Sequence, residues 1–187
     1  MTDFLIPDKV GEPRVAWRSW KLHAENEDLW LQSISQGDSF WYPREIKTAE
    51  CNLVTDSSHG ENESPPVEGC KCGIYALNSN IDLVGITYAS NVGPGRELFV
   101  WGEINLWGKI IEGQHGIKAQ HAYPKHLYLR GDVHRAYPFA WNKLDSYAIK
   151  DLMKEAWGVP VDIGETISRR SLEDQIARID PPASDKV

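Results

Sequence analysis

Residues 98–112 read LFVWGEINLWGKIIE, and residues 117–130 read IKAQHAYPKHLYLR. The first stretch is rich in aromatic and β-branched side chains, which favour strands, and its apolar residues alternate from Val100 to Ile110. A turn at residues 112–116 separates the two stretches, and Pro124 interrupts the second. We therefore predict an antiparallel hairpin that forms the centre of a β-sheet.

Two glycines, Gly102 and Gly108, lie on the apolar face of the first of these strands. Glycine inside a strand marks a bend, a β-bulge or the close approach of another backbone. Trp101 and Trp107 lie on the opposite face, where they either pack a second layer or form an exposed aromatic patch that binds a partner. We predict a strongly bent sheet, with Trp101 and Trp107 as candidate partner-binding residues.

The sequence before this hairpin predicts further strands. Residues 14–22 and 29–34 alternate and flank a polar turn, which indicates a first hairpin. Shorter extended pieces are expected at residues 40–42 and 45–51. Residues 73–89 are ambiguous, and a helix followed by a strand is one interpretation of them.

The C-terminal part of the chain predicts helices. Apolar residues recur at helical spacing from Leu144 to Trp157, and Gly158 follows as a C-terminal stop. A second, more polar helix is expected at residues 168–179, and Pro181 and Pro182 end it.

A candidate metal site combines all three cysteines of the chain with one histidine. Its residues are Cys51, His59, Cys70 and Cys72. Zinc prefers four thiolate and imidazole ligands at tetrahedral corners. Residues 52–69 contain almost no large apolar side chains, so a metal clip would explain so long a loop in a compact domain. The alternative is that Cys51 and Cys72 are buried as small hydrophobic residues and that His59 is a solvated loop residue.

Such a zinc ion would be either structural or catalytic. Three thiolates and one imidazole fill the coordination sphere, whereas a catalytic zinc keeps a position open for water. His59-Gly60-Glu61 nevertheless has the H-x-E pattern of zinc deaminases that act on nucleobases. The alternative site of a zinc-dependent hydrolase or deaminase would consist of His59, Glu61, Cys70 and Cys72. The structural interpretation is favoured, because the P-C-x-x-C sequence of those deaminases is absent.

Hydrophobic residues make up 41% of the 187 residues, which is sufficient for one folded core. We expect an extended lead-in at residues 1–13, one zinc-stabilised α+β domain at residues 14–179, and a frayed tail at residues 180–187. The predicted fold is a bent antiparallel β-sheet with a zinc-clipped loop and two C-terminal helices.

Several motifs resemble those of a group of uncharacterised actinobacterial and actinophage proteins. Residues 70–76 resemble its C-x-C-G-I/L-Y-A signature, and residues 100–111 resemble its G-x-V-x-L-W-G-x-V strand. Further similar segments are 17–22, 41–43, 119–124 and 152–161, with Lys118 where the group has Arg and Trp157 where it has Tyr. The resemblance implies a phage or actinobacterial accessory protein, and it implies no particular activity.

The formal net charge is −7, from 27 acidic and 20 basic residues. Proteins that grip a nucleic-acid backbone usually carry a basic face, so this charge argues against nonspecific nucleic-acid binding. A local basic surface near Lys118, Lys125 and Arg130 keeps sequence-specific nucleic-acid binding as a second alternative. No apolar run approaches the roughly 18 residues of a membrane span, and residues 1–10 show no targeting signal. We therefore expect a cytoplasmic protein that does not bind membranes.

Four more histidines lie close together in the sequence, at positions 115, 121, 126 and 134. They could form a second metal site or an acid–base pair, but only Asp132 lies at a helpful spacing, which favours exposed or core histidines. Without a convincing catalytic set, the main expectation is a non-enzymatic interaction module. It would contain one structural Zn²⁺ and bind a protein partner.

Overall fold

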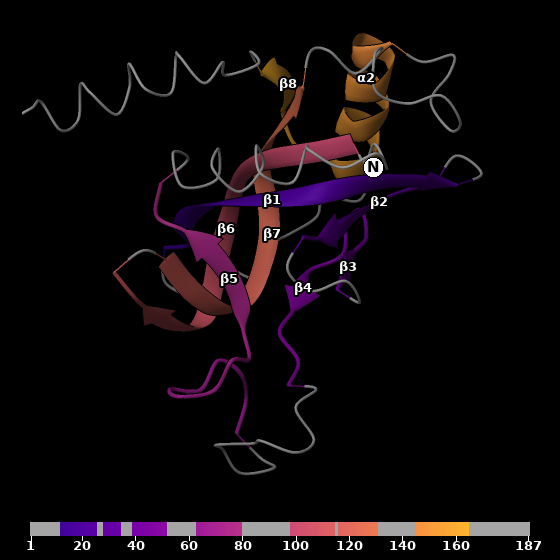
Figure 1. Cartoon of the computed structure of the whole chain (residues 1–187). Helices are drawn as coiled ribbons and strands as arrows, with labels where there is room; N and C mark the ends of the chain where they lie inside the picture. Colours follow the sequence, from indigo (N-terminus) through magenta and orange to yellow (C-terminus); the bar gives the residue numbers. More distant parts are fainter. Residues whose placement is uncertain are drawn as a thin grey trace, which may run out of the picture.

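In this computed structural model, the structure describes residues 12–25, 28–34, 39–51, 63–79, 98–114, 116–130 and 145–164. These residues form an eight-stranded mixed sheet and one helix (Figure 1). In chain order the elements are β1 (Arg14–Glu25), β2 (Asp28–Ser33), β3 (Phe40–Trp41), β4 (Lys47–Thr48), β5 (Ile74–Leu77), β6 (Leu98–Glu112), β7 (Gly116–Arg130), α2 (Ser146–Trp157) and β8 (Val161–Gly164).

The two long strands β6 and β7 pair as an antiparallel hairpin, which confirms the central prediction from the sequence. β6 also pairs with β1, and β1 pairs with β2, so the predicted first hairpin is confirmed as well. β5 pairs with both β7 and β1. The pairings β1–β6–β7–β5 therefore return to β1, and the sheet curls around its own core.

The two glycines of β6 lie where the hairpin is irregular. The register of β6 against β7 shifts between Glu103 and Ile104, and again between Trp107 and Ile110. Gly108 has a positive φ of 80°, a conformation that glycine adopts without strain. A Cβ on Gly102 would overlap the backbone carbonyl of His126. The prediction that these glycines mark bulges and close backbone approach is confirmed.

The prediction of a purely antiparallel sheet is wrong for one pair of strands. β8 runs parallel to β7, with Leu127 opposite Val161 and Leu129 opposite Ile163. Parallel neighbours need a long crossover connection, commonly a helix, and α2 lies in this one. The ambiguous residues 73–89 begin as a strand, because β5 occupies their first part and their remainder lies largely outside the described residues.

Helix α2 confirms the first predicted C-terminal helix. Asp145 caps its N-terminus by accepting a 2.8 Å hydrogen bond from the Ala148 amide. Gly158 ends it in the left-handed conformation, with φ of 67°. The second predicted helix, at residues 168–179, and the tail at 180–187 lie outside the described residues, as does nearly all of the lead-in.

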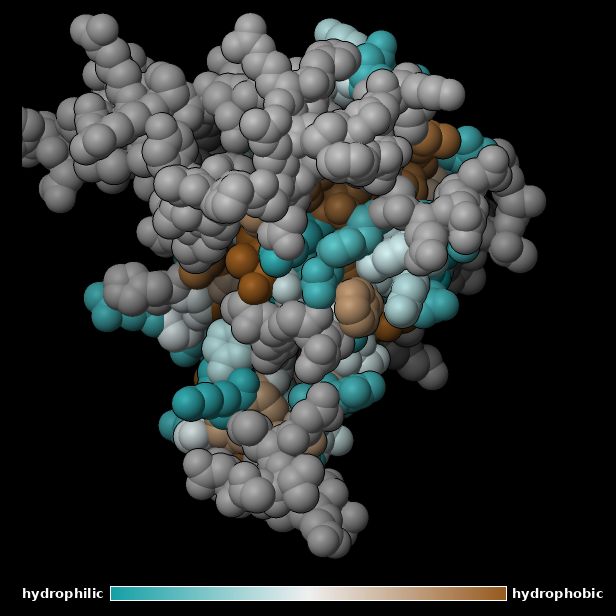
Figure 2. Space-filling view, turned by 45° about the vertical axis from the view of Figure 1, so that its right-hand side comes forward, coloured by the Kyte–Doolittle hydropathy of each residue, from teal (hydrophilic) through white to brown (hydrophobic). Residues whose placement is uncertain are grey.

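The core is one cluster of buried side chains from the strands of the curled sheet and from α2. Alternate residues of β6 are fully buried, namely Val100, Ile104 and Leu106 at 0% exposure, and Leu127 and Leu129 of β7 match them. The helix contributes its own buried face, which consists of Ile149, Met153 and Trp157. Figure 2 shows the complementary pattern on one face of the molecule, where hydrophobic side chains surface at several separate places between hydrophilic ones.

The buried Arg18 fills the position where β5 and β2 diverge along the same edge of β1. Its guanidinium donates to the Tyr75 carbonyl of β5 and, over 2.7 Å, to the Ser33 hydroxyl of β2. It also lies over the Trp41 ring at 5.2 Å. Burial lowers the pKa of Arg18 to about 10, so the side chain remains charged at neutral pH. Arg18 therefore holds β5, and the chain that leads into it, against the rest of the sheet.

We predict that Gly102→Ala destabilises the protein by about 3 kcal/mol, because its methyl group has no space beside the β7 backbone. The matched control is Gly158→Ala, where nothing lies within 4 Å and only the left-handed backbone resists substitution. That control should cost about 1 kcal/mol. Chemical denaturation of both variants measures the difference, and equal losses would contradict the close approach at Gly102.

Candidate metal centre

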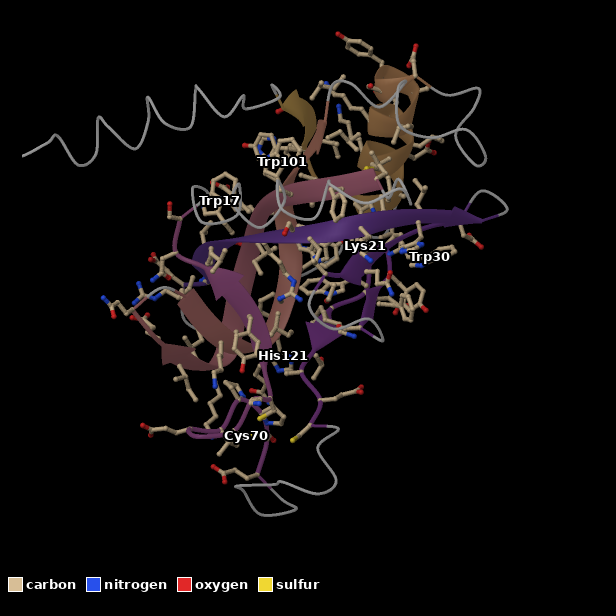
Figure 3. The ribbon with its side chains drawn as sticks, in the orientation of Figure 1. Trp17, Lys21, Trp30, Cys70, Trp101 and His121 are labelled. Carbon is tan, nitrogen blue, oxygen red and sulfur yellow. The ribbon has the colours of Figure 1, made fainter. Side chains whose placement is uncertain are left out.

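Strands β4 and β5 bring the three cysteines together, because both pair with the same part of β7. Thr48 of β4 lies opposite His121, and Ile74 of β5 lies opposite Ala119. The Ala49 amide extends the β4 contact by donating to the Gln120 carbonyl over 2.8 Å. Cys51 follows β4, and Cys70 and Cys72 precede β5, so the three thiols meet at the end of the sheet away from α2 and β8 (Figures 1 and 3).

The three thiols lie close enough together to bind one metal ion, and one sulfur–sulfur distance has the value of a tetrahedral site. The three Sγ atoms lie within 4.8 Å of one another, and those of Cys51 and Cys70 are 3.8 Å apart. Zinc–sulfur bonds of about 2.3 Å at tetrahedral angles place two sulfurs roughly 3.8 Å apart. Cys70 and Cys72 are 3% and 4% exposed, and Cys51 is partly exposed. The group could therefore hold a metal ion.

The chain around Cys70 forms a tight turn that presents sulfur and amide groups to each other. The Cys70 amide donates to the Val67 carbonyl over 3.2 Å, and the Cys72 amide donates to the Cys70 sulfur over 3.4 Å. Gly69 and Gly73 have positive φ values of 79° and 120°. These two glycines allow the sharp turn around the cysteine pair, because glycine adopts positive φ without strain.

The electrostatics of the group oppose ionisation of the thiols when no cation is bound. Burial, and to a smaller extent the neighbouring Cys70 and Cys51 sulfurs, raises the pKa of Cys72 to about 11. Without a cation, the Cys72 thiol is therefore protonated at neutral pH, because ionisation in this buried site is costly. A divalent metal reverses this cost, because a coordinating thiol is deprotonated outright.

Lys118 supports the turn from β7. Its ammonium donates to the Cys70 carbonyl over 2.7 Å and lies 5.3 Å from the centre of the Tyr75 ring. A Cβ on Gly73 would lie 3.3 Å from the Lys118 Cβ, so the lysine stem packs on the turn. Sequence analysis missed this role, although the position of Lys118 opposite the residue after Ile74 follows once the strand register is known.

The fourth predicted ligand, His59, lies outside the described residues, as does Glu61. Within the described part of the chain, no histidine, aspartate or glutamate joins the three thiols. Because the chain has only three cysteines, a fourth protein ligand would have to be of another type. His59 therefore stays a prediction.

The two candidate partner-binding tryptophans occupy different environments. Trp107 is 3% exposed, and its ring lies 5.9 Å from that of His121, so it belongs to the core. Trp101 is only partly buried and stacks on Tyr128, with centroids 6.2 Å apart. Trp17 stacks on the same tyrosine at 6.0 Å, and Figure 3 shows both tryptophans near the end of the molecule opposite Cys70. We call Trp17, Trp101 and Tyr128 the aromatic surface.

The other candidate residues have separate partners. His126 pairs with Asp162 over 2.8 Å, whereas Thr48 contacts His121 over 3.1 Å, so these two histidines do not share a site. Lys125 pairs with Glu103 over 3.0 Å. His115 and His134 lie outside the described residues, as does the side chain of Arg130.

Comparison with protein-family models, curated proteins and solved structures gives no match to this chain. In the described part of the structure, no helix has the length and hydrophobicity needed to cross a membrane.

We predict that protein purified without added metal contains about one zinc per chain, and that Cys72→Ser loses the metal and unfolds at lower temperature. The physical reason is that metal binding and folding are coupled in such sites. Elemental analysis and thermal unfolding measure both effects. A well-folded protein without zinc would contradict the metal site and would favour three core thiols instead.

Lys118→Met should lower zinc affinity about tenfold, which is the usual effect of removing a group that supports a metal ligand. Methionine retains most of the packing volume of lysine, so the loss of zinc affinity measures the contribution of the Lys118 ammonium. Lys125→Met is the control, because that lysine lies on the same strand but pairs with Glu103. Competition with a chromogenic chelator measures the affinities, and equal values for the two variants would exclude a supporting role for Lys118.

Proposed function

We propose that this chain is a non-enzymatic interaction module whose sheet is stabilised by one structural zinc ion. The proposed ligands are Cys51, His59, Cys70 and Cys72. The observation that supports the proposal is the 3.8 Å separation of the Cys51 and Cys70 sulfurs, which equals the spacing of two tetrahedral zinc ligands. With an imidazole in the fourth position, the zinc has no open site for water or substrate.

A structural zinc here would act on two very short strands. β4 has two residues and β5 has four, so each has few backbone hydrogen bonds of its own. A metal bound to Cys51 and to the Cys70–Cys72 turn would tie both strands to β7 and close the loop between them. Closing a loop of this length by a cross-link contributes about 3 kcal/mol.

The proposed partner site is the aromatic surface. Large aromatic side chains with part of their area exposed are frequent anchors in protein interfaces. Trp101 lies over Gly164 of β8, where a Cβ would overlap its indole, so the ring is held in one place. Lys118 and Lys125 are engaged in contacts of their own, which makes a basic nucleic-acid face a weaker proposal. The proposed phage or actinobacterial origin and cytoplasmic location rest on the sequence.

We predict that Trp101→Ala reduces retention of a protein partner about thirtyfold, as expected for a central interface tryptophan. Affinity capture would compare the zinc-loaded chain with this variant and with Tyr42→Ala. Tyr42 is a suitable control, because it is 50% exposed and lies outside the aromatic surface. Unchanged capture by Trp101→Ala, with an unchanged unfolding temperature, would contradict a partner site there.

Glu61→Gln separates the module from the alternative enzyme. We expect the variant to keep its zinc, its unfolding temperature and its partner binding, because the proposed structural site uses no general base. Assays of nucleobase deamination and ester hydrolysis provide the opposite readout. Zinc-dependent turnover that is lost in Glu61→Gln would replace the proposed function with a deaminase or hydrolase.

A further inference from the structure

The three thiols differ in exposure and in the strand beside which they lie. Cys51 is partly exposed, whereas Cys70 and Cys72 are buried. Cys51 also comes from a different strand, since it follows β4 and the other two precede β5. Its sulfur lies 3.8 Å from that of Cys70. An oxidant that arrives from solvent therefore meets Cys51 first, with Cys70 as its neighbour.

From this arrangement we propose that the site is a redox switch, in which a peroxide converts Cys51 and Cys70 into a disulfide and releases the metal. The inference deepens the proposed function, because the released ion is the zinc that the proposal assigns to this site. Exposure selects the cysteine that reacts, and the 3.8 Å contact places the Cys70 sulfur within reach of the oxidised Cys51.

The chemistry balances with hydrogen peroxide as the oxidant. The Cys51 thiolate attacks one peroxide oxygen, the O–O bond breaks, and a sulfenic acid and hydroxide result. The Cys70 thiolate then attacks the Cys51 sulfur, the S–S bond forms, and the S–O bond breaks with loss of a second hydroxide. Two protons convert both hydroxides into water. The two sulfurs supply the two electrons, and Zn²⁺ leaves with its charge unchanged.

The disulfide would replace the metal as the link between β4 and β5. Cys51 lies just beyond β4, and Cys70 lies just before β5, so a bond between them joins the same two strands to β7 that zinc joins. Oxidation would then release the metal ion, while β4 and β5 stay linked through the disulfide. Cys72 would remain as a thiol, held by the turn in which its amide donates to the Cys70 sulfur.

The sequence permits a direct assignment of the bond. Residues 48–71 contain no lysine or arginine before Lys71, so trypsin places Cys51 and Cys70 in one peptide. The next tryptic peptide is residues 72–96, and Cys72 is its only cysteine. A bond between Cys51 and Cys70 therefore leaves the first peptide unlinked and lighter by two hydrogen atoms. Either bond to Cys72 would join the two peptides.

The experiment treats the full zinc-loaded chain with increasing hydrogen peroxide. We expect complete zinc release, measured with a chromogenic chelator, while reactive thiols fall from three to one. Non-reducing tryptic mass spectrometry should show peptide 48–71 internally oxidised, and dithiothreitol should restore zinc binding. Linked peptides, disulfide-bonded dimers, sulfonic acid on Cys51, or retention of zinc would each overturn the switch.

Metal-free protein, prepared with a chelator under reducing conditions and then oxidised, separates the two proposals. If the chain as isolated holds no zinc, the structural zinc fails, and the Cys51–Cys70 assignment can still be made by the same peptide map. Cys72→Ser provides a second check, because it removes the competing thiol and should give the same oxidised peptide 48–71. An absence of that peptide in both preparations would contradict the proposed bond.

Discussion

The candidate site depends on the backbone of β7 between Gly116 and Ala122. This one stretch pairs with β5 and then with β4, while the long strand β6 holds its other edge. Backbone hydrogen bonds to a common strand leave the two short strands little freedom in position. The cysteines that flank them are consequently brought together by pairing that involves no cysteine side chain. The arrangement of the three thiols therefore depends on the strand pairing of the sheet.

The two short strands in turn depend on additional contacts to stay in place. A four-residue strand and a two-residue strand have little hydrophobic area with which to stay in place, although Ile74 and Ala76 reach the core. Arg18 adds a contact to β5, and Lys118 adds one to the turn before it. A bound metal would add a link between the strands that neither contact supplies. A small site can therefore have a large effect on the stability of this end of the sheet.

β6 and α2 were predicted correctly from the sequence because their hydrophobic patterns extend over many residues. Fifteen residues of β6 alternate clearly enough to indicate a strand, and the apolar spacing of α2 does the same for a helix. β4 and β8 are too short for any period to be reliable, and the parallel pairing of β8 depends on the crossover that contains α2. The sequence left open whether Trp107 is buried or exposed, for a different reason. The register shifts between Trp107 and Ile110, so strict alternation does not determine which side chains are buried next to this shift.

The sequence predicted which cysteines lie together, but it did not predict how far apart their sulfurs lie. Three clustered cysteines in a chain without others indicate a metal, but only the strand register brings Cys51 within 3.8 Å of Cys70. Charge then limits what the complete site can be. Three thiolates around Zn²⁺ carry one net negative charge, and a neutral imidazole leaves that charge unchanged, whereas a carboxylate would double it. The Lys118 ammonium, which donates to the Cys70 carbonyl, offsets one negative charge. A neutral fourth ligand is therefore the better electrostatic fit, which is the physical argument for an imidazole such as that of His59 over a carboxylate such as that of Glu61.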